Sequence, residues 1–406
     1  MRALKAEIES QSTKYTDYTV QTIFFGGGTP TAVEAATLCE VLQVLKKHFN
    51  IAIDAEISME ANPGTVTAEA LVQYKEAGIN RLSIGLQSAN DEELKLLGRI
   101  HTYADFLETY RLAVETGFTN INVDLMSALP GQTVQGYEET LQKILALDPP
   151  PRHISAYSLI IEEGTPFYEV YSAEREEMDR TGEIRSVSVN DKKPHLPSEE
   201  AERLMYESTA RILAKAGYER YEISNYSQPG YECRHNTVYW RRGDYVGFGL
   251  GAASLVNNVR FRNTDSLQDY LKFFEYVADD RNGTETEPKD ICINVELREG
   301  IIGEQEILSV EEQMEEFMFL GLRMTNGISK EEFRETFGVS LEDIFGEVIR
   351  KNIKEGLLEE ITSEKAQKEI ADKRMQGAQL QQSGDRIALT KRGLDVSNYV
   401  MAQFML

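Results

Sequence analysis

The stretch Thr22-Ile23-Phe24-Phe25-Gly26-Gly27-Gly28-Thr29-Pro30 decides the fold of this chain. Its first half is an apolar run of the kind that forms a buried β-strand. Three consecutive glycines follow, and they leave backbone N–H groups open to a ligand because no side chain blocks the approach. Glycine also adopts the positive φ that such a loop often needs. The stretch therefore predicts a strand that leads into a ligand-binding loop.

Further strand-like runs follow the first, and helical patterns separate them. The runs cover residues 19–25, 54–60, 81–86, 120–126 and 153–159. The first spacer carries apolar residues at helical spacing, Leu38, Val41, Leu42, Leu45 and Phe49. Alternating strand and helix in units of about 30 residues predicts parallel strands joined by right-handed crossovers. Both a (β/α) barrel and a doubly wound sheet satisfy this pattern, and both bind ligands at the carboxyl ends of their strands.

Local residues also mark where the helices begin and end. Asn90 is placed as an N-cap, whereas Gly78 and Gly117 are placed as C-caps. Residues 2–12 have a helical pattern with Leu4 and Ile8 one turn apart, so the sequence begins with a helix. In a (β/α) array a helix normally follows a strand. We expect either a strand upstream of this sequence or a helix that closes the bottom of the barrel.

Composition restricts the class of protein. The 406 residues suffice for one large domain and a smaller one, and 67 acidic against 43 basic residues give a formal charge of −24. So acidic a chain is not expected to bind nucleic acid or an anionic membrane surface. No run approaches the roughly 18 apolar residues of a membrane span, and the first residues lack the apolar core of a signal peptide. We expect a cytoplasmic protein.

A series of segments resembles the radical S-adenosylmethionine family of oxygen-independent coproporphyrinogen III oxidases. The segments are FFGGGTPT, SMEANPGT, RLSIGLQS, LGRIHT, NVDLMSALPGQT, HISAYSL, EGTPF, EISNYSQPGYECRHNTVYW and YVGFGLGAAS. The resemblance runs from about residue 2 to the C-terminus. It implies an α/β fold, a partial (β/α)6 radical-SAM barrel whose first strand is missing here, with a smaller C-terminal domain. It also implies a [4Fe–4S] cluster and S-adenosylmethionine as cofactors.

The same resemblance implies contacts to S-adenosylmethionine. By position these fall on Gly27, Gly28, Thr29, Glu60, Gln87, Arg99 and Asp124. The residue types suit the ligand, because an arginine can pair with a carboxylate and acidic side chains can accept from hydroxyl and amino groups. For single residues a structural role stays open: Glu60 or Asp124 as a helix cap, and Arg99 in a surface ion pair.

The cysteines depart from the family pattern. The family holds its cluster with three closely spaced cysteines after the first strand, whereas Cys39, Cys233 and Cys292 are scattered, and none of them is expected to bind a cluster. A segment missing upstream explains both the absent cysteines and the absent strand. We prefer that explanation to a variant that has lost its cluster. As written, the chain is not expected to perform radical chemistry.

One segment separates two members of the resembling family. His235-Asn236-Thr237-Val238-Tyr239-Trp240 matches an HNxxYW motif that resembles a haem-binding site, in which His235 is the expected iron ligand. Cys233 is a rival soft ligand, but we prefer a buried structural role for it as a small apolar residue. The preferred function is therefore a haem chaperone that binds haem and delivers it to haem-requiring proteins. The alternatives are an oxygen-independent coproporphyrinogen III oxidase and a barrel without a cluster that acts only through its surfaces.

Domain limits follow from these patterns. Residues 1–225 are assigned to the barrel, with a mobile surface insertion at 172–198, and residues 226–310 to a barrel-associated region with the histidine segment. A second charged insertion is expected at 361–384. Residues 311–406 have the order of elements of a winged helix. Because this part carries more acidic than basic residues, we expect it to face protein or to cover the barrel, not to bind DNA.

Overall fold

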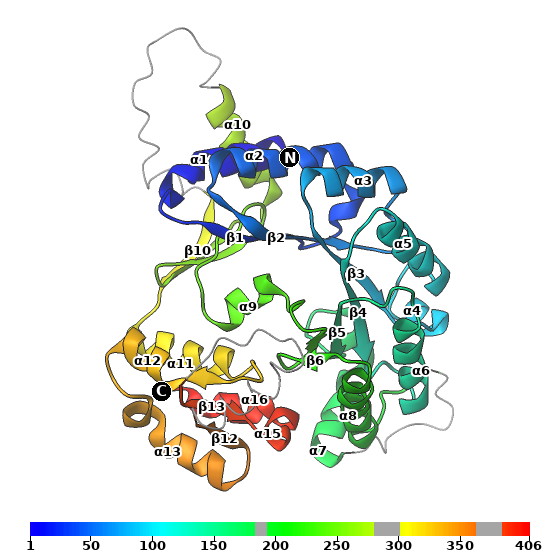
Figure 1. The fold of residues 1–406 in the computed structure, drawn as a ribbon, viewed down its shortest axis with the longest axis vertical. Coiled ribbons are helices and arrows are strands. Elements are labelled where there is room, and N and C mark those ends of the chain that lie inside the picture. The colour runs from blue at the N-terminus through cyan, green and yellow to red at the C-terminus, as the bar shows by residue number, and fades with distance from the viewer. Residues whose placement is uncertain (183–192, 280–300, 363–383) are drawn as a thin grey trace.

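The computed structural model describes residues 1–182, 193–279, 301–362 and 384–406 (Figure 1). A seven-stranded sheet with the order β1-β2-β3-β4-β5-β7-β6 forms its centre. The first five strands are parallel: β1 (Val20–Phe25), β2 (Ile51–Ala61), β3 (Arg81–Gln87), β4 (Asn120–Ser127) and β5 (His153–Ser158). They match the five predicted runs, which confirms the parallel α/β fold. The short strands β6 (Glu219–Arg220) and β7 (Asn225–Ser227) complete the edge, and β7 is antiparallel to β5.

Helices cover the outer face of this sheet (Figure 1). They are α1 (Arg2–Gln11), α2 (Ala35–His48), α3 (Ala68–Ala77), α4 (Asp91–Leu96), α5 (Tyr103–Glu115), α6 (Val134–Leu145) and α8 (Glu199–Lys215). Two of the predicted caps are confirmed: the Asn90 side chain accepts from the Glu92 N–H, and Gly78 ends α3 at φ 103°. The third is shifted by one residue, because the C-cap of α5 is Thr116 and Gly117 follows it with φ 90°. The predicted initial helix is confirmed as α1, and Ile8 on it is buried.

Alternate residues of each strand point to opposite faces, and the two faces differ in polarity. Apolar residues such as Met59, Ile84 and Val123 belong to the main core between strands and helices. Their neighbours on the strands are polar, among them Glu56, Ser58, Glu60, Ser83, Asn122 and Asp124. A polar inner face is unusual for parallel strands, which are normally apolar on both faces. It marks the inner face as the place for a ligand.

The middle region of the chain contains α9 (Arg234–Trp240), β8 (Ala253–Val256), β9 (Val259–Asn263), α10 (Leu267–Asp279) and β10 (Ile302–Ile307). Of these elements, α9 lies on the open inner side of the sheet, whereas α10 lies beside α1 (Figure 1). The strands pair in the order β10-β9-β8. Buried Glu7 of α1 holds this region, because its carboxylate accepts hydrogen bonds from the Gly249 N–H, the Asn263 amide and the Tyr270 hydroxyl.

The C-terminal part has its own apolar core and the predicted winged-helix order. Its elements are α11 (Val310–Gly321), β11 (Ile328–Ser329), α12 (Lys330–Phe337), α13 (Leu341–Lys354), β12 (Leu358–Ile361), β13 (Arg386–Leu389), α15 (Lys391–Asp395) and α16 (Ser397–Met401). The three strands form an antiparallel sheet, β11-β13-β12. Phe333 and Phe345 stand in the centre of the core, where both are buried.

The prediction of a surface loop at 172–198 is wrong for its first part. Helix α7 (Pro166–Thr181) continues through this stretch, with Thr165 as its N-cap. Tyr171 and Met178 lie two turns apart on the helix and pack with Leu196, so a narrow apolar stripe within a charged sequence suffices to hold it. Residues 183–192 of the predicted insertion, and residues 363–383 of the second one, lie outside the described part of the chain.

Candidate functional site

The glycine loop stands at the carboxyl end of β1 and opens outward. Gly27 has φ 83°, a left-handed conformation that favours glycine, and Gly26 to Gly28 are exposed. A Cβ placed on Gly27 or Gly28 would meet no described atom within 4 Å, whereas one on Gly26 would come within 3.1 Å of the Glu60 carboxyl carbon. A hydrogen bond holds the Thr29 side chain in place, because its Oγ1 accepts from the Asn62 amide at 2.9 Å. The loop therefore offers free space above an acidic side chain.

Two carboxyl groups, from β2 and β4, lie close enough to influence each other. Burial, and then the charge of Asp124, raise the pKa of Glu60, while a hydrogen bond from the Gly27 backbone opposes the rise. Burial also raises the pKa of Asp124, although hydrogen bonds from Asn122, Tyr157 and Ser155 oppose it. Raised carboxyl pKa values on the inner face show that these groups give up hydration, a pattern frequent at functional sites.

Gln87 and Arg99 complete the predicted set. Gln87 ends β3 with φ 73°, which is strained for a residue other than glycine. Its buried Oε1 has no hydrogen-bond partner in the part of the chain that the structure describes. Arg99 follows α4 and forms no ion pair with a described residue, so the predicted alternative of a surface pair finds no support in the described chain. Its charge acts on Tyr157, as do the charges of Asp124 and Glu60. The inner face thus brings Glu60, Arg99 and Asp124 around Tyr157.

Two residues of this site were missed by sequence reasoning. Tyr157 hydrogen-bonds to Asp124, and its pKa lies well above the ordinary value, first because it is buried and second because of the Asp124 charge. Asn62 holds Thr29, and a Cβ on Gly85 would meet both the Asn62 and Gln87 side chains within 3.3 Å. Strand alternation could have found Tyr157, since it lies two residues after inward-facing Ser155.

His235 lies on α9, on the same inner side as the glycine loop. Its ring stacks on Phe24 of β1 with 4.9 Å between centroids. Both ring nitrogens have partners: Nδ1 lies 2.9 Å from the Thr22 hydroxyl and Nε2 lies 2.9 Å from the Tyr239 hydroxyl. Burial lowers the pKa of His235 to about 4, so the ring is neutral near pH 7. A neutral imidazole is the form that ligates a metal.

A carboxylate from β2 anchors the helix that carries His235. Glu56 accepts from the Arg234 and His235 N–H groups at 3.1 Å each, and from the Cys233 thiol at 3.6 Å. Negative charge at a helix N-terminus satisfies free N–H groups and the helix dipole. The Cys233 N–H also donates to the Tyr221 hydroxyl. Glu56 and Tyr221 therefore fix the start of the histidine segment.

Tyr221 continues the polar network toward Asp124. Its hydroxyl lies 2.8 Å from Nε2 of buried His153, whose Nδ1 lies 2.6 Å from Oδ1 of Asn122. The Asn122 amide donates to Asp124 at 2.7 Å. One assignment satisfies every contact: His153 is neutral with the proton on Nδ1, and burial, which lowers its pKa, supports this.

The described thiols do not fit an iron–sulfur cluster. Cys39 lies on α2, where its thiol contacts the Gln73 carbonyl of the next helix. Cys233 is buried, and burial raises its pKa to about 11, which disfavours the thiolate that ligates a metal. In the described ranges, no three His, Cys, Asp or Glu side chains are grouped so that they could hold a metal ion. Cys292 lies outside the described residues.

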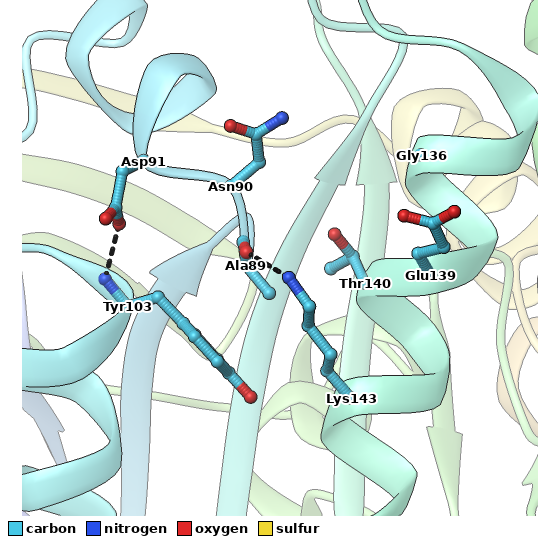
Figure 2. A pocket seen from close by; sticks show the side chains of 8 residues that line it. All are labelled: Ala89, Asn90, Asp91, Tyr103, Gly136, Glu139, Thr140 and Lys143. Carbon is cyan, nitrogen blue, oxygen red and sulfur yellow. Dashed lines mark hydrogen bonds between the residues drawn. The ribbon is translucent and has the colours of Figure 1, made fainter.

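A separate pocket of about 340 Å³ lies between the helices of the outer face (Figure 2). It is lined by Ala89, Asn90, Asp91, Tyr103, Gly136, Glu139, Thr140 and Lys143. Lys143 donates to the Ala89 carbonyl at 2.8 Å and lies over the Tyr103 ring, while Asp91 accepts from the Tyr103 N–H. These contacts join α6 to the start of α5. None of the predicted ligand residues lines this pocket.

Comparisons with known proteins agree with this geometry. Residues 4–144 match the Radical SAM superfamily, and residues 308–364 match the HemN C-terminal domain. The chain is 32% identical over 406 residues to the heme chaperone HemW of Lactococcus lactis subsp. lactis (strain IL1403), covering 99% of this chain and 90% of that protein. It is 34% identical over 359 residues to the heme chaperone HemW of Bacillus subtilis (strain 168), covering 88% and 84%.

Among solved structures, the chain is similar to coproporphyrinogen III oxidase (HemN) from Escherichia coli, a radical SAM enzyme. The TM-score is 0.70 at 19% identity, and the match covers 99% of this chain and 82% of that one. The parallel sheet, the glycine loop and the C-terminal module therefore define a HemN-like radical SAM architecture. The identity and coverage of its curated relatives go further: this chain belongs to the HemW family. None of the helices in the described ranges is long and apolar enough to cross a membrane.

Proposed function

We propose that this protein binds haem through His235 and delivers it to haem-requiring proteins. The observation that carries the proposal is the environment of His235, a neutral imidazole beside the Phe24 and Tyr239 rings on the inner side of the sheet. Imidazole is a common axial ligand of haem iron, and aromatic rings pack against a macrocycle. The curated relatives are named as haem chaperones, so the oxidase and the cluster-less interaction protein are not favoured.

Haem binding requires a local change around the ring. Nε2 of His235 contacts the Tyr239 hydroxyl, and Nδ1 contacts the Thr22 hydroxyl. One nitrogen must exchange its partner for iron. The hydrogen bond between His235 Nε2 and the Tyr239 hydroxyl is the easier one to break. Both residues lie on α9, so a rotation of the Tyr239 side chain is enough to free Nε2.

A haem titration tests the proposal. Addition of haem to the full chain should shift the Soret band to saturation, and His235→Ala should lose or alter this spectrum without unfolding the protein. His101 is the matched control, because it is also a buried imidazole with a backbone partner, at 3.2 Å from the Leu86 carbonyl. His101→Ala should leave haem binding nearly unchanged. An unaltered spectrum and affinity in His235→Ala would refute iron ligation by His235.

We also propose that the strand-end site binds S-adenosylmethionine. The orphaned Gln87 Oε1, the space above Gly27 and Gly28, and an Arg99 without an ion-pair partner in the described chain suit a ligand with amino, hydroxyl and carboxylate groups. Glu60 and Asp124 would accept hydrogen bonds, and Arg99 would pair with the carboxylate. In this superfamily the ligand supplies a radical through a [4Fe–4S] cluster, but the described thiols do not fit one.

Calorimetry with S-adenosylmethionine tests this second site. Arg99→Ala should weaken binding because the carboxylate loses its partner. Equal affinity of the parent and Arg99→Ala would contradict the assignment.

The cytoplasm is the proposed compartment, and the composition of the chain supports it.

A further inference from the structure

Arg81, the first residue of β3, is a buried cation that the sites above leave unexplained. The residue is 2% exposed, and its buried Nε has no hydrogen-bond partner among the described residues. No carboxylate in the described ranges forms an ion pair with it. Buried polar groups nearly always have partners, and a buried charge without a counter-charge is costly. Such a residue calls for an anion that the described residues do not provide.

The position of Arg81 places it close to the histidine segment. Strand register pairs Arg81 with Ser58 of β2, and Ser58 with Phe24 of β1, the ring on which His235 stacks. Burial is the main cause of the low pKa of both His153 and His235, and the Arg81 charge adds to the lowering in each. The guanidinium therefore acts on the inner face of the sheet, in the row of residues that His235 contacts.

The nearest carboxylates of the protein are committed to other donors. Glu56 accepts from two N–H groups of α9 and from the Cys233 thiol. Asp124 accepts from the Asn122 amide at 2.7 Å, and the Ser83 hydroxyl lies 3.3 Å from it. Neither carboxylate hydrogen-bonds to the guanidinium, although the Arg81 charge acts on Asp124 and opposes the rise of its pKa. The described residues therefore leave the guanidinium open to a carboxylate of a ligand.

We propose that Arg81 binds a carboxylate group of a ligand that lies against the inner face of the sheet. A guanidinium is suited to this role because its planar fork pairs with both carboxylate oxygens. Two ligands carry the group: haem through a propionate, and S-adenosylmethionine through its amino-acid end. The shared row with His235 favours the propionate, and this choice rests on the proposed haem function.

Four ligands separate the two sources. Haem, haem dimethyl ester, S-adenosylmethionine and decarboxylated S-adenosylmethionine are titrated into the full chain and into Arg81→Met. We expect Arg81→Met to bind haem roughly 10- to 100-fold more weakly than the parent, the range for a lost charged hydrogen bond. Its affinity for the ester should equal that of the parent. Arg81→Lys, which keeps the charge but loses the fork, should fall between.

Other outcomes are equally decisive. A loss confined to S-adenosylmethionine and absent for its decarboxylated form would support the carboxylate site and assign it to that ligand. Unchanged binding of all four ligands, or equal loss for each acid and its derivative, would overturn the proposal. Iron ligation is read separately from the Soret band of His235→Ala. If His235 proves not to ligate iron, the affinities of haem and its dimethyl ester still test the role of Arg81.

A matched variant excludes a merely structural role. Arg386 is a second buried arginine, but its guanidinium donates to the Asn326 and Gly327 carbonyls. Arg386→Met should lower the unfolding midpoint and leave ligand affinities unchanged. Arg81→Met should keep or raise the midpoint, since the buried guanidinium has no hydrogen bond or ion pair with a described residue, and burying such a charge is costly. A midpoint lowered as far as in Arg386→Met would show that Arg81 is structural and would overturn the proposal.

Discussion

At the scale of single residues, hydrogen bonds and burial determine which form of each side chain is available. The His235 ring is neutral near pH 7 because burial lowers its pKa to about 4, even though the Glu56 charge acts in the opposite direction. Neither ring nitrogen is free, because Thr22 and Tyr239 occupy them. Both nitrogens of the group that is proposed to bind iron are therefore engaged with hydroxyl groups of the protein.

Removal of the Tyr239 hydroxyl should make iron binding easier. Tyr239→Phe frees Nε2 of His235 and keeps the ring, so haem affinity should rise by roughly 2- to 10-fold, the value of one neutral hydrogen bond. Soret titration measures the change. Tyr245→Phe is the control, because Tyr245 packs edge-on against Tyr239 without a bond to His235. A lower haem affinity in Tyr239→Phe would indicate that the hydroxyl assists binding.

Asp124 should oppose folding near neutral pH. Burial raises its pKa above the ordinary 3.8, so the folded protein holds this proton more tightly than the unfolded chain, and stability falls as pH rises above 3.8. Asp124→Asn should therefore raise the unfolding midpoint at pH 7 by a few degrees and weaken S-adenosylmethionine binding. The gain should disappear in strong acid.

Asp105 is the control of opposite sign. It belongs to the Thr102 capping box, and the Thr102 hydroxyl and backbone N–H lower its pKa. Asp105→Asn should lower the midpoint at pH 7 and leave ligand binding unchanged. If Asp124→Asn destabilises the protein as Asp105→Asn does, the Asp124 carboxylate stabilises the fold and the argument from burial is wrong.

At the scale of elements, α9 depends on the sheet for its position. It has seven residues and no side-chain cap of its own, because its N-cap residue is Cys233. Short isolated helices are unstable in water. The Glu56 carboxylate of β2 supplies the missing acceptor for its first N–H groups. The sheet thus holds the histidine segment in place.

Glu56→Gln should loosen this helix. An amide keeps one acceptor oxygen and turns an NH₂ group toward donors, so the free energy of unfolding should fall by about 1–3 kcal/mol. Trp240 on α9 is the chain's only tryptophan, and its emission should shift to longer wavelength. Exposed Glu69, in the first turn of α3, is the control: Glu69→Gln should leave the free energy of unfolding nearly unchanged. Unchanged Trp240 emission in Glu56→Gln would contradict the anchoring role.

At the scale of the whole molecule, ion pairs join the C-terminal module to the rest of the chain. Buried Glu316 of α11 accepts from Arg242 at 2.8 Å and from Arg260 of β9 at 2.6 Å. Arg323 after α11 reaches buried Glu222 and lies over the Trp240 ring. The module therefore contacts the segment that carries α9, in agreement with the expected barrel-covering role.

Glu316→Ala should weaken this junction strongly. Removal of one partner leaves two arginines without their counter-charge, at a cost of about 3–5 kcal/mol for a buried pair. Differential scanning calorimetry should show a lower midpoint or a separate transition of the C-terminal module. Glu342→Ala, which removes a partly exposed pair with Lys330 in the same module, should cost less than about 1 kcal/mol. Equal effects of the two variants would show that the junction does not depend on Glu316.

The sequence by itself determined the elements and their order. Apolar runs, caps and the glycine loop are local features, so they predicted β1 to β5, the helix ends and the winged-helix order. The strand-end rule also placed Glu60, Gln87 and Asp124 on one side, because parallel strands present their carboxyl ends together. Helix α7 was missed, since only a narrow apolar stripe holds it within a charged sequence.

Only the tertiary structure decided which side chains meet. Glu56 and His235 are 179 residues apart, and nothing local to either shows that one anchors the helix of the other. The isolation of Arg81, the bond between His235 and Tyr239, and the place of Tyr157 beside Asp124 are likewise set by packing across strands. The physical reason is that pattern and propensity act over a few residues, whereas burial, charge and partners depend on elements distant in the chain.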